Sequence, residues 1–190
     1  IAPCFRDEDA RGDRSPGEFY QLDMEMAFAT QEDVFAVLED VLPPIFAKFG
    51  TYDIASAAPF RRIPYNTALE TYGSDKPDLR IDLTCKNVTH LFENSEFEPL
   101  RGQTVKMVDI SDCALTRKQV EKLLSDCEVQ SGSKAYWFKV DEKGELAGGI
   151  AKFVTGLRPQ LEQVLTLAPN TLVVVAAGAS ATKSAGVLIK

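Results

Sequence analysis

Hydrophobic and polar residues alternate near the beginning of the chain. Between residues 19 and 28, alternate positions hold Tyr20, Leu22, Met24, Met26 and Phe28. A period of two is typical of a β-strand with one apolar face, which we expect to be directed toward a core. A strand is also predicted over residues 1–8, and a charged loop over residues 9–18 would join the two. We expect these strands to pair antiparallel.

A helical spacing of apolar residues follows the second strand. Thr30 is a predicted N-cap, because the first turn after it is acidic. Gly50 ends the pattern, and Pro43-Pro44 would kink or restart the helix. We expect this helix to pack on the sheet. A short second helix is predicted over residues 66–72, ended by Gly73.

Beyond Arg80 the chain changes to short strands and helices in alternation. Strands are predicted over residues 104–110, 135–140 and 171–177, which are rich in β-branched or aromatic side chains. Helices are predicted after a capping box at Thr116 and Gln119, and over residues 149–155, 159–167 and 180–186. The predicted fold class is therefore α+β, with an antiparallel-sheet piece over residues 1–82 and a small α+β domain over residues 83–190.

Composition limits the functions open to the chain. Its 190 residues, 45% of them hydrophobic, suffice for one domain or two small ones. The net charge of -7 argues against a main nucleic-acid-binding site, because that affinity comes from clustered Lys and Arg. No cluster of Arg, Lys and aromatic residues marks a binding face in the second half, and Trp137 is expected in the core.

The cysteines and the histidine argue against a bound metal. Cys4, Cys85, Cys113 and Cys127 are far apart in the sequence, and His90 is the one histidine. This pattern fits no zinc site and favours a reducing cytosol, with His90 as a structural or surface residue. The longest apolar run, over residues 172–177, is too short to span a membrane. We expect a soluble, cytoplasmic protein with no membrane contact.

The two ends of the sequence point to a longer protein. The chain begins at Ile1 without an initiator Met and closes on a short apolar run before Lys190. Neither end has the polar tail that free termini usually carry. We expect a segment cut from a larger polypeptide.

The first two strands would present polar side chains on one face. Cys4, Arg6 and Glu8 share a face of the first strand, and Gln21, Asp23 and Glu25 share a face of the second. In an antiparallel pair these faces adjoin and form a charged floor. The planar guanidinium of Arg6 suits a phosphate or a carboxylate, and a carboxylate can accept from an amino group such as that of adenine. On pattern alone, a merely solvated sheet face remains the alternative.

One series of residues in the first two predicted strands and their loop is distinctive: residues 5–9, Arg11, Asp13, Arg14, Pro16, Glu18, Phe19, Gln21, Asp23 and residues 25–28. This series resembles the second signature motif of class II aminoacyl-tRNA synthetases, in the form found in the family of bacterial-type aspartyl-tRNA synthetases. Residues 73–80, Gly-Ser-Asp-Lys-Pro-Asp-Leu-Arg, resemble the segment that leads to the family's inserted domain. Residues 115–119, 151–153 and 172–176 resemble that domain, called GAD and shared with tRNA-dependent amidotransferases.

The resemblance implies roles for the residues of the charged floor. Arg6 would be the catalytic residue that holds the α-phosphate of ATP and the aspartate carboxylate, while Asp7 and Glu8 would contact ATP. The implied site floor is Gln21, Asp23 and Glu25, and Arg11 and Arg14 would approach the acceptor end of tRNA. Ser15 stands where many relatives carry a glutamine, so it receives no role.

The implied reaction is that of an aspartate–tRNA ligase. ATP and L-aspartate would give aspartyl-adenylate, and tRNA(Asp) would then be charged, with tRNA(Asn) left open as a second substrate. Mg²⁺ would accompany the nucleotide, and a homodimer would work in the cytoplasm. Because no Gly-rich stretch followed by Asp-Arg is present, we expect the 190 residues alone to be inactive. The alternatives are a non-catalytic module that binds tRNA or a partner, and a tRNA-independent synthetase paralogue.

Overall fold

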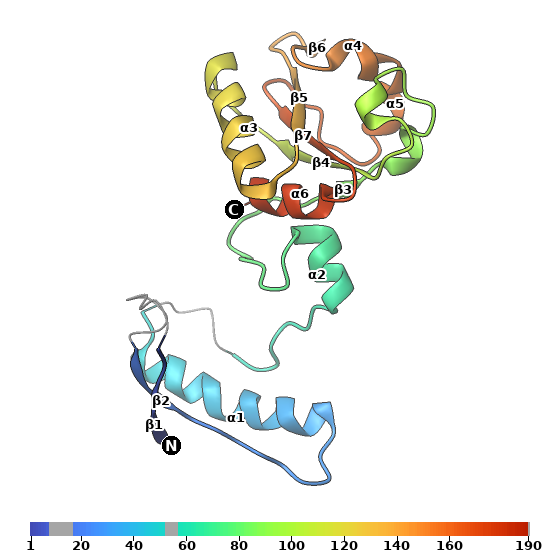
Figure 1. Ribbon diagram of the computed structural model, residues 1–190. Coiled ribbons are helices and arrows are strands. Elements are labelled where there is room, and N and C mark those ends of the chain that lie inside the picture. Colours follow the sequence, from blue (N-terminus) through green and yellow to red (C-terminus); the bar gives the residue numbers. More distant parts are fainter. Residues whose placement is uncertain (8–16, 52–56, 190) are drawn as a thin grey trace. The chain divides into compact units, whose positions relative to one another are not determined.

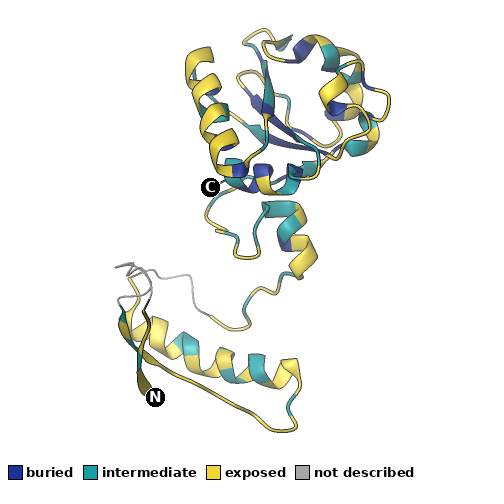
Figure 2. Cartoon of the chain, in the orientation of Figure 1, coloured by how far each residue is buried: buried dark blue, intermediate teal, exposed yellow. Residues whose placement is uncertain are grey.

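The computed structural model describes residues 1–7, 17–51 and 57–189. Its contacts divide the chain into an N-terminal unit, Ile1–Arg62, and a C-terminal unit, Ile63–Lys190 (Figure 1). The buried residues belong almost entirely to the C-terminal unit (Figure 2).

The N-terminal unit begins with the predicted antiparallel pair. Strand β1 (Ala2–Phe5) pairs with β2 (Glu18–Gln21), with Cys4 opposite Phe19. The predicted second strand is too long, because β2 ends at Gln21, which lies opposite the first residue of β1. Beyond this point the described residues offer no partner strand, and a chain without ladder hydrogen bonds does not remain a strand.

The apolar side of this hairpin is exposed. Tyr20 is 72% exposed and Leu22 69%, and Met24 and Met26 are also exposed. The prediction that this face is directed toward a core is therefore wrong for the described residues. Two strands alone form no second layer, so an apolar face of this kind has nothing to pack against.

Helix α1 (Gln31–Phe49) begins and ends where the sequence predicts. The Thr30 hydroxyl accepts from the Asp33 N–H, and the Asp33 carboxylate accepts from the Thr30 N–H at 2.7 Å. The Thr30 hydroxyl also donates to this carboxylate at 2.7 Å, and the hydrogen bonds from the Thr30 hydroxyl and the Thr30 N–H lower the pKa of Asp33. The helix continues through Pro43 and Pro44 and ends where the Gly50 N–H donates to the Phe46 carbonyl at 2.7 Å.

The apolar stripe of α1 is not covered by the sheet as expected. No residue of this helix is buried, and Ile45, Phe46 and Phe49 are 44%, 47% and 72% exposed. On another side, the Phe60 N–H donates to the Glu39 carboxylate at 3.0 Å. The Arg62 guanidinium lies 4.6 Å from the Phe35 ring centroid, so this segment returns along the helix.

The C-terminal unit contains a five-stranded antiparallel sheet in the order β3-β4-β7-β5-β6. Its strands are β3 (Lys86–Asn87), β4 (Val105–Ile110), β5 (Ala135–Val140), β6 (Leu146–Ala147) and β7 (Leu172–Ala177). The three strands predicted for this part are confirmed to within one residue at either end. Strand β7 lies at the centre, which explains its continuous apolar run: both of its faces are buried.

Alternation along the strands separates two layers of core. On one face, Val105 and Met107 of β4 and Phe138 of β5 pack with α4 (Ala151–Val154) and α5 (Arg158–Leu161). The short 3-10 segments Thr89–Leu91, Glu98–Leu100 and Thr155–Leu157 complete this layer. On the other face, Val108 and Val174 pack with α6 (Ala181–Ile189) and α3 (Arg117–Ser131). The capping box predicted at Thr116 is present, while the helix predicted over residues 159–167 ends at Leu161.

Helix α2 (Tyr65–Tyr72) belongs to the C-terminal unit. It packs on α6, and its Thr71 carbonyl accepts from the Cys85 N–H at 2.7 Å. The buried ammonium of Lys106 lies 2.5 Å from the Glu70 carboxylate. Residues 63–82 therefore pack with the rest of the C-terminal unit. The boundary near Asp82 between a catalytic domain and an inserted domain remains a prediction.

The carboxyl group of Asp109 should make the stability of the C-terminal unit depend on pH. Burial acts to raise the pKa of its carboxyl, but hydrogen bonds from Lys86 Nζ at 2.6 Å and the Thr166 N–H at 2.9 Å outweigh burial and lower it. A lowered folded-state pKa stabilises the fold above the unfolded value of 3.8 and loses that effect as pH falls through the folded value. We expect Asp109→Asn to cost about 1–3 kcal/mol at pH 7.

Urea denaturation of wild type and Asp109→Asn at pH 7, 5, 4 and 3 measures this difference. The two free energies of unfolding should converge as pH falls below 3.8. Asp126→Asn is the control, because Asp126 forms an exposed pair with Lys122 at 2.9 Å and should change stability little. A difference for Asp109→Asn that does not change with pH would contradict the assignment.

Candidate functional site

One face of the β1–β2 pair brings together residues from both strands. Cys4 and Arg6 lie on this face, and the register places Phe19 and Gln21 beside them. The Cys4 thiol is 3.5 Å from Gln21 Oε1, and the Arg6 guanidinium is 5.3 Å from the Phe19 ring centroid. The predicted meeting of polar faces is confirmed for Cys4 and Gln21, while the side chain beside Arg6 is the aromatic Phe19. Stacking on an aromatic ring orients a guanidinium.

The backbone holds Arg6 at the end of the strand pair. Its N–H donates to the carbonyl of Gly17 at 3.0 Å, which extends the ladder by one bond beyond β1. Gly17 has φ of 85°, a left-handed conformation that a residue with a side chain rarely adopts. This glycine lets the chain enter β2 so that Phe19 comes to lie under the arginine.

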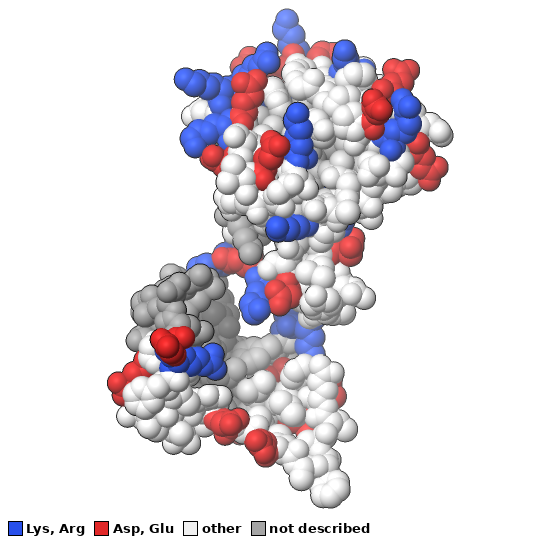
Figure 3. Space-filling view, in the orientation of Figure 1, with Lys and Arg blue, Asp and Glu red and all other residues white. Residues whose placement is uncertain are grey.

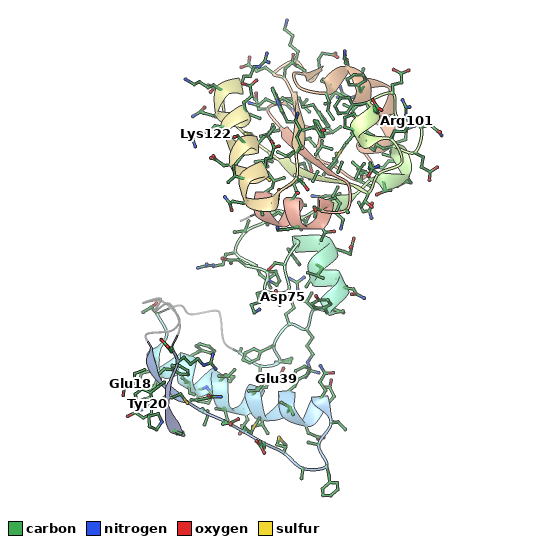
Figure 4. All side chains as sticks on the ribbon, viewed as in Figure 1. Glu18, Tyr20, Glu39, Asp75, Arg101 and Lys122 are labelled. Atoms are coloured by element: carbon green, nitrogen blue, oxygen red, sulfur yellow. The ribbon has the colours of Figure 1, made fainter. Side chains whose placement is uncertain are left out.

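The remaining predicted floor residues are not on the strand. Asp23 and Glu25 follow the end of β2 and are exposed, because no described strand pairs with that part of the chain. Their predicted alternation on a strand is therefore wrong. Asp7 is exposed just beyond β1, while Glu8, Arg11 and Arg14 lie outside the described residues. Figure 4 shows Glu18 and Tyr20, which lie on the other face of the pair.

The segment over residues 73–80 is a turn that holds itself together. Gly73 has φ of 63° and ends α2, and the Ser74 hydroxyl accepts from the Lys76 N–H at 3.1 Å. The Asp78 carboxylate accepts from the Arg80 guanidinium at 2.5 Å and from the Arg80 N–H at 3.0 Å. These contacts lower the pKa of Asp78 to about 2. These contacts fix the local shape of the segment. The side chains of Ser74, Asp78 and Arg80 therefore have a structural role here.

Comparison with known families identifies the chain. A family model described as tRNA synthetases class II (D, K and N) matches residues 1–163. The chain belongs to this family.

Two relatives illustrate how similar this synthetase chain is to known proteins. "Aspartate--tRNA ligase" of Streptomyces coelicolor is 46% identical over 180 residues, which are 94% of this chain and 30% of that protein. "Aspartate--tRNA(Asp/Asn) ligase" of Rickettsia prowazekii is 46% identical over 178 residues, 90% of this chain and 29% of that protein. The chain thus spans about 30% of the length of the curated relatives that it matches.

The sequence did not predict one cluster of residues that the fold of this synthetase chain brings together. Trp137, expected in the core, is only partly buried and lines two hollows with Arg117, Lys152 and Lys143. These residues come from four separate segments, so no local pattern could have revealed them. By contrast, His90 is exposed, and Gly149 lies in a turn before α4, which begins at Ala151.

Within residues 1–7, 17–51 and 57–189, no three His, Cys, Asp or Glu side chains are grouped as metal ligands would be. In the same described residues, no helix combines the length and the apolar character needed to cross a membrane.

Proposed function

We propose that this chain is part of an aspartate–tRNA ligase. Relatives that carry this name are 46% identical over 94% of the chain. The observation that carries the proposal in the structure is Arg6, stacked on Phe19 at one face of the antiparallel pair. A strand-borne, oriented guanidinium is suited to stabilising charge at a reacting phosphate.

The proposed first step joins aspartate to AMP. A carboxylate oxygen of L-aspartate attacks the α-phosphorus of ATP, the bond to the β-phosphate oxygen breaks, and pyrophosphate leaves. Negative charge grows on the α-phosphate oxygens in the transition state. Arg6 would hold one of these oxygens and the aspartate carboxylate, so it would both position the reactants and offset that charge. Mg²⁺ would accompany ATP and pyrophosphate as a substrate complex.

The proposed second step charges tRNA. A hydroxyl of the terminal adenosine attacks the carbonyl carbon of aspartyl-adenylate, and AMP leaves. We assign Arg11 and Arg14 to the acceptor end of tRNA, Asp7 and Glu8 to ATP, and Gln21, Asp23 and Glu25 to the polar floor. The Rickettsia relatives named for tRNA(Asp/Asn) support tRNA(Asn) as a second substrate.

The remaining parts of the proposal concern the whole enzyme. We assign residues 1–82 to its catalytic domain and residues 83–190 to a GAD insertion domain. The compact sheet with helices on both faces supports the second assignment, because such a domain folds on its own core. We further propose a cytoplasmic homodimer.

Pyrophosphate exchange tests the proposal. The full-length protein is expected to exchange labelled pyrophosphate into ATP when L-aspartate is added, and the 190-residue chain alone is expected to show no exchange above background. L-asparagine in place of L-aspartate is the control and should give none. Exchange absent from the folded full-length protein would contradict the ligase and favour a non-catalytic module that binds tRNA or a partner. Aspartate-dependent exchange without charging of tRNA would instead favour a tRNA-independent paralogue.

A further inference from the structure

A hollow at the β6 edge of the C-terminal unit is lined by two cationic side chains and an aromatic ring. It has a volume of about 490 Å³ and is lined by Arg117 of α3, Lys152 of α4, the indole of Trp137 and the turn Gly148-Gly149. Both cations are exposed, and no carboxylate is among the residues that line the hollow. Arg117 Nε donates to the Glu121 carboxylate at 2.8 Å, and Lys152 Nζ lies 4.6 Å from the Phe153 ring centroid, so a phosphate would compete with these contacts. Two cations beside an aromatic ring suit a ligand that carries both negative charge and a flat ring.

The glycine turn fixes the indole in place. A Cβ on Gly148 would lie 2.5 Å from Cη2 of Trp137, and one on Gly149 would lie 1.8 Å from the Trp137 carbonyl oxygen. Both glycines have positive φ. The backbone of the turn therefore lies directly against the ring, where any side chain would push it away. Trp137 also packs on the cluster around Val120, so the exposed part of its ring is held rigid. A rigid ring stacks a ligand at little entropic cost.

A second hollow adjoins the indole and continues the surface. Its volume is about 470 Å³, and Trp137 and Gly148 line it as well. The exposed Lys143 contributes a cation, and the Asp141 carboxylate is engaged by the N–H groups of Lys143 at 2.9 Å and Glu145 at 2.8 Å. The two hollows thus form a track with the indole between cations, which fits successive phosphates of a strand better than one isolated anion.

We propose that this Trp137 track binds a segment of single-stranded RNA. One base would stack on Trp137, with the neighbouring phosphates paired to Arg117 and Lys152 on one side and to Lys143 on the other. On the face of the C-terminal unit seen in Figure 3, Lys and Arg are mixed with Asp and Glu. Glu142, which lines the second hollow, opposes the phosphates and limits the affinity. The track shares no residue with the β1–β2 face, and the proposal does not rest on the proposed ligase.

Fluorescence of Trp137 tests the proposal directly, because it is the single tryptophan of the chain. Titration of the 190-residue chain with a single-stranded pentaribonucleotide should quench its emission, and the affinity should fall as salt rises. Replacing both Arg117 and Lys152 by alanine should weaken binding by about tenfold. The slope of the logarithm of the binding constant against the logarithm of salt concentration should fall in magnitude by about one or more, because each lost phosphate contact removes about one unit. Glu142→Gln should strengthen binding.

The matched control removes a cation of the same helix outside the track. Lys122 is 75% exposed on α3 and pairs with Asp126, and Figure 4 shows it pointing outward. Lys122→Ala should leave the affinity unchanged. Trp137→Leu, followed by the anisotropy of a labelled pentaribonucleotide, should weaken binding by about tenfold.

Three results would overturn the RNA proposal: no quenching at millimolar pentaribonucleotide, equal weakening by Lys122→Ala, or a response to AMP as strong as that to the strand. Pyrophosphate exchange needs no RNA, so this proposal and the ligase fail independently.

Discussion

Replacing Arg6 by alanine in the full-length protein should lower the rate constant of aspartate-dependent pyrophosphate exchange by about 10²- to 10³-fold. The physical reason is that an oriented cation at the α-phosphate acts mainly in the transition state, where charge on the phosphate oxygens is largest. Phe19 holds the guanidinium at 5.3 Å from its ring centroid, so little reorganisation is needed when the reaction occurs. Arg6→Lys should recover only part of the activity, because an ammonium lacks the planar fork that binds two oxygens.

Steady-state exchange kinetics separate this role from simple binding. A residue that acts in the transition state lowers kcat, whereas one that binds ATP equally in both states raises KM alone. Arg61→Ala is the matched control, since Arg61 is an exposed arginine of the same unit that lies outside the strand pair. Because Arg6 is exposed, its replacement should leave the circular dichroism spectrum unchanged. An Arg6→Ala enzyme within about threefold of wild type would remove Arg6 from the catalytic assignment.

Much of the C-terminal unit could be predicted from sequence, because its signals are local. The capping box at Thr116 depends on residues three apart, and the run over β7 reflects burial on both faces of a central strand. The same holds for Thr30 at the start of α1. Such features depend on short-range hydrogen bonds and burial, which the pattern of side chains records directly.

Predictions failed where they needed a partner elsewhere in the chain. The alternation over residues 19–28 is a strand pattern, yet β2 stops at Gln21 because a strand needs a neighbour for its hydrogen bonds. Of the predicted charged floor, Cys4, Arg6 and Gln21 could thus be predicted from the pairing of two adjacent strands, and Asp23 and Glu25 could not. The Trp137 track was missed for a related reason: Arg117, Trp137 and Lys152 meet only through the tertiary fold.

The contact between Gly73 and Gly186 should make a single added methyl group strongly destabilising. A Cβ on Gly73 would lie 2.3 Å from the Gly186 Cα, and one on Gly186 would lie 2.3 Å from the Gly73 carbonyl oxygen. Both neighbours are backbone atoms and cannot move aside as a flexible side chain would. Gly73→Ala should cost about 2–5 kcal/mol, the sum of a left-handed conformation and an overpacked contact. Gly186→Ala should cost about 1–3 kcal/mol, since alanine favours the helix but meets the same contact.

Urea denaturation of the 190-residue chain can separate the two costs. Gly132 ends α3 as Gly73 ends α2, with φ of 75°, and a Cβ there would meet no atom within 4 Å. Gly132→Ala should therefore cost only the conformational part, about 1–2 kcal/mol. The excess for Gly73→Ala measures the contact of α2 with α6, and Gly186→Ala measures the same contact without a change in φ. If Gly73→Ala and Gly132→Ala lost equal free energy while Gly186→Ala lost none, the close packing of residues 63–82 on α6 would be refuted. A large excess would show that the turn over residues 73–80 is fixed to the C-terminal sheet through this contact, because α6 packs on β4 and β7.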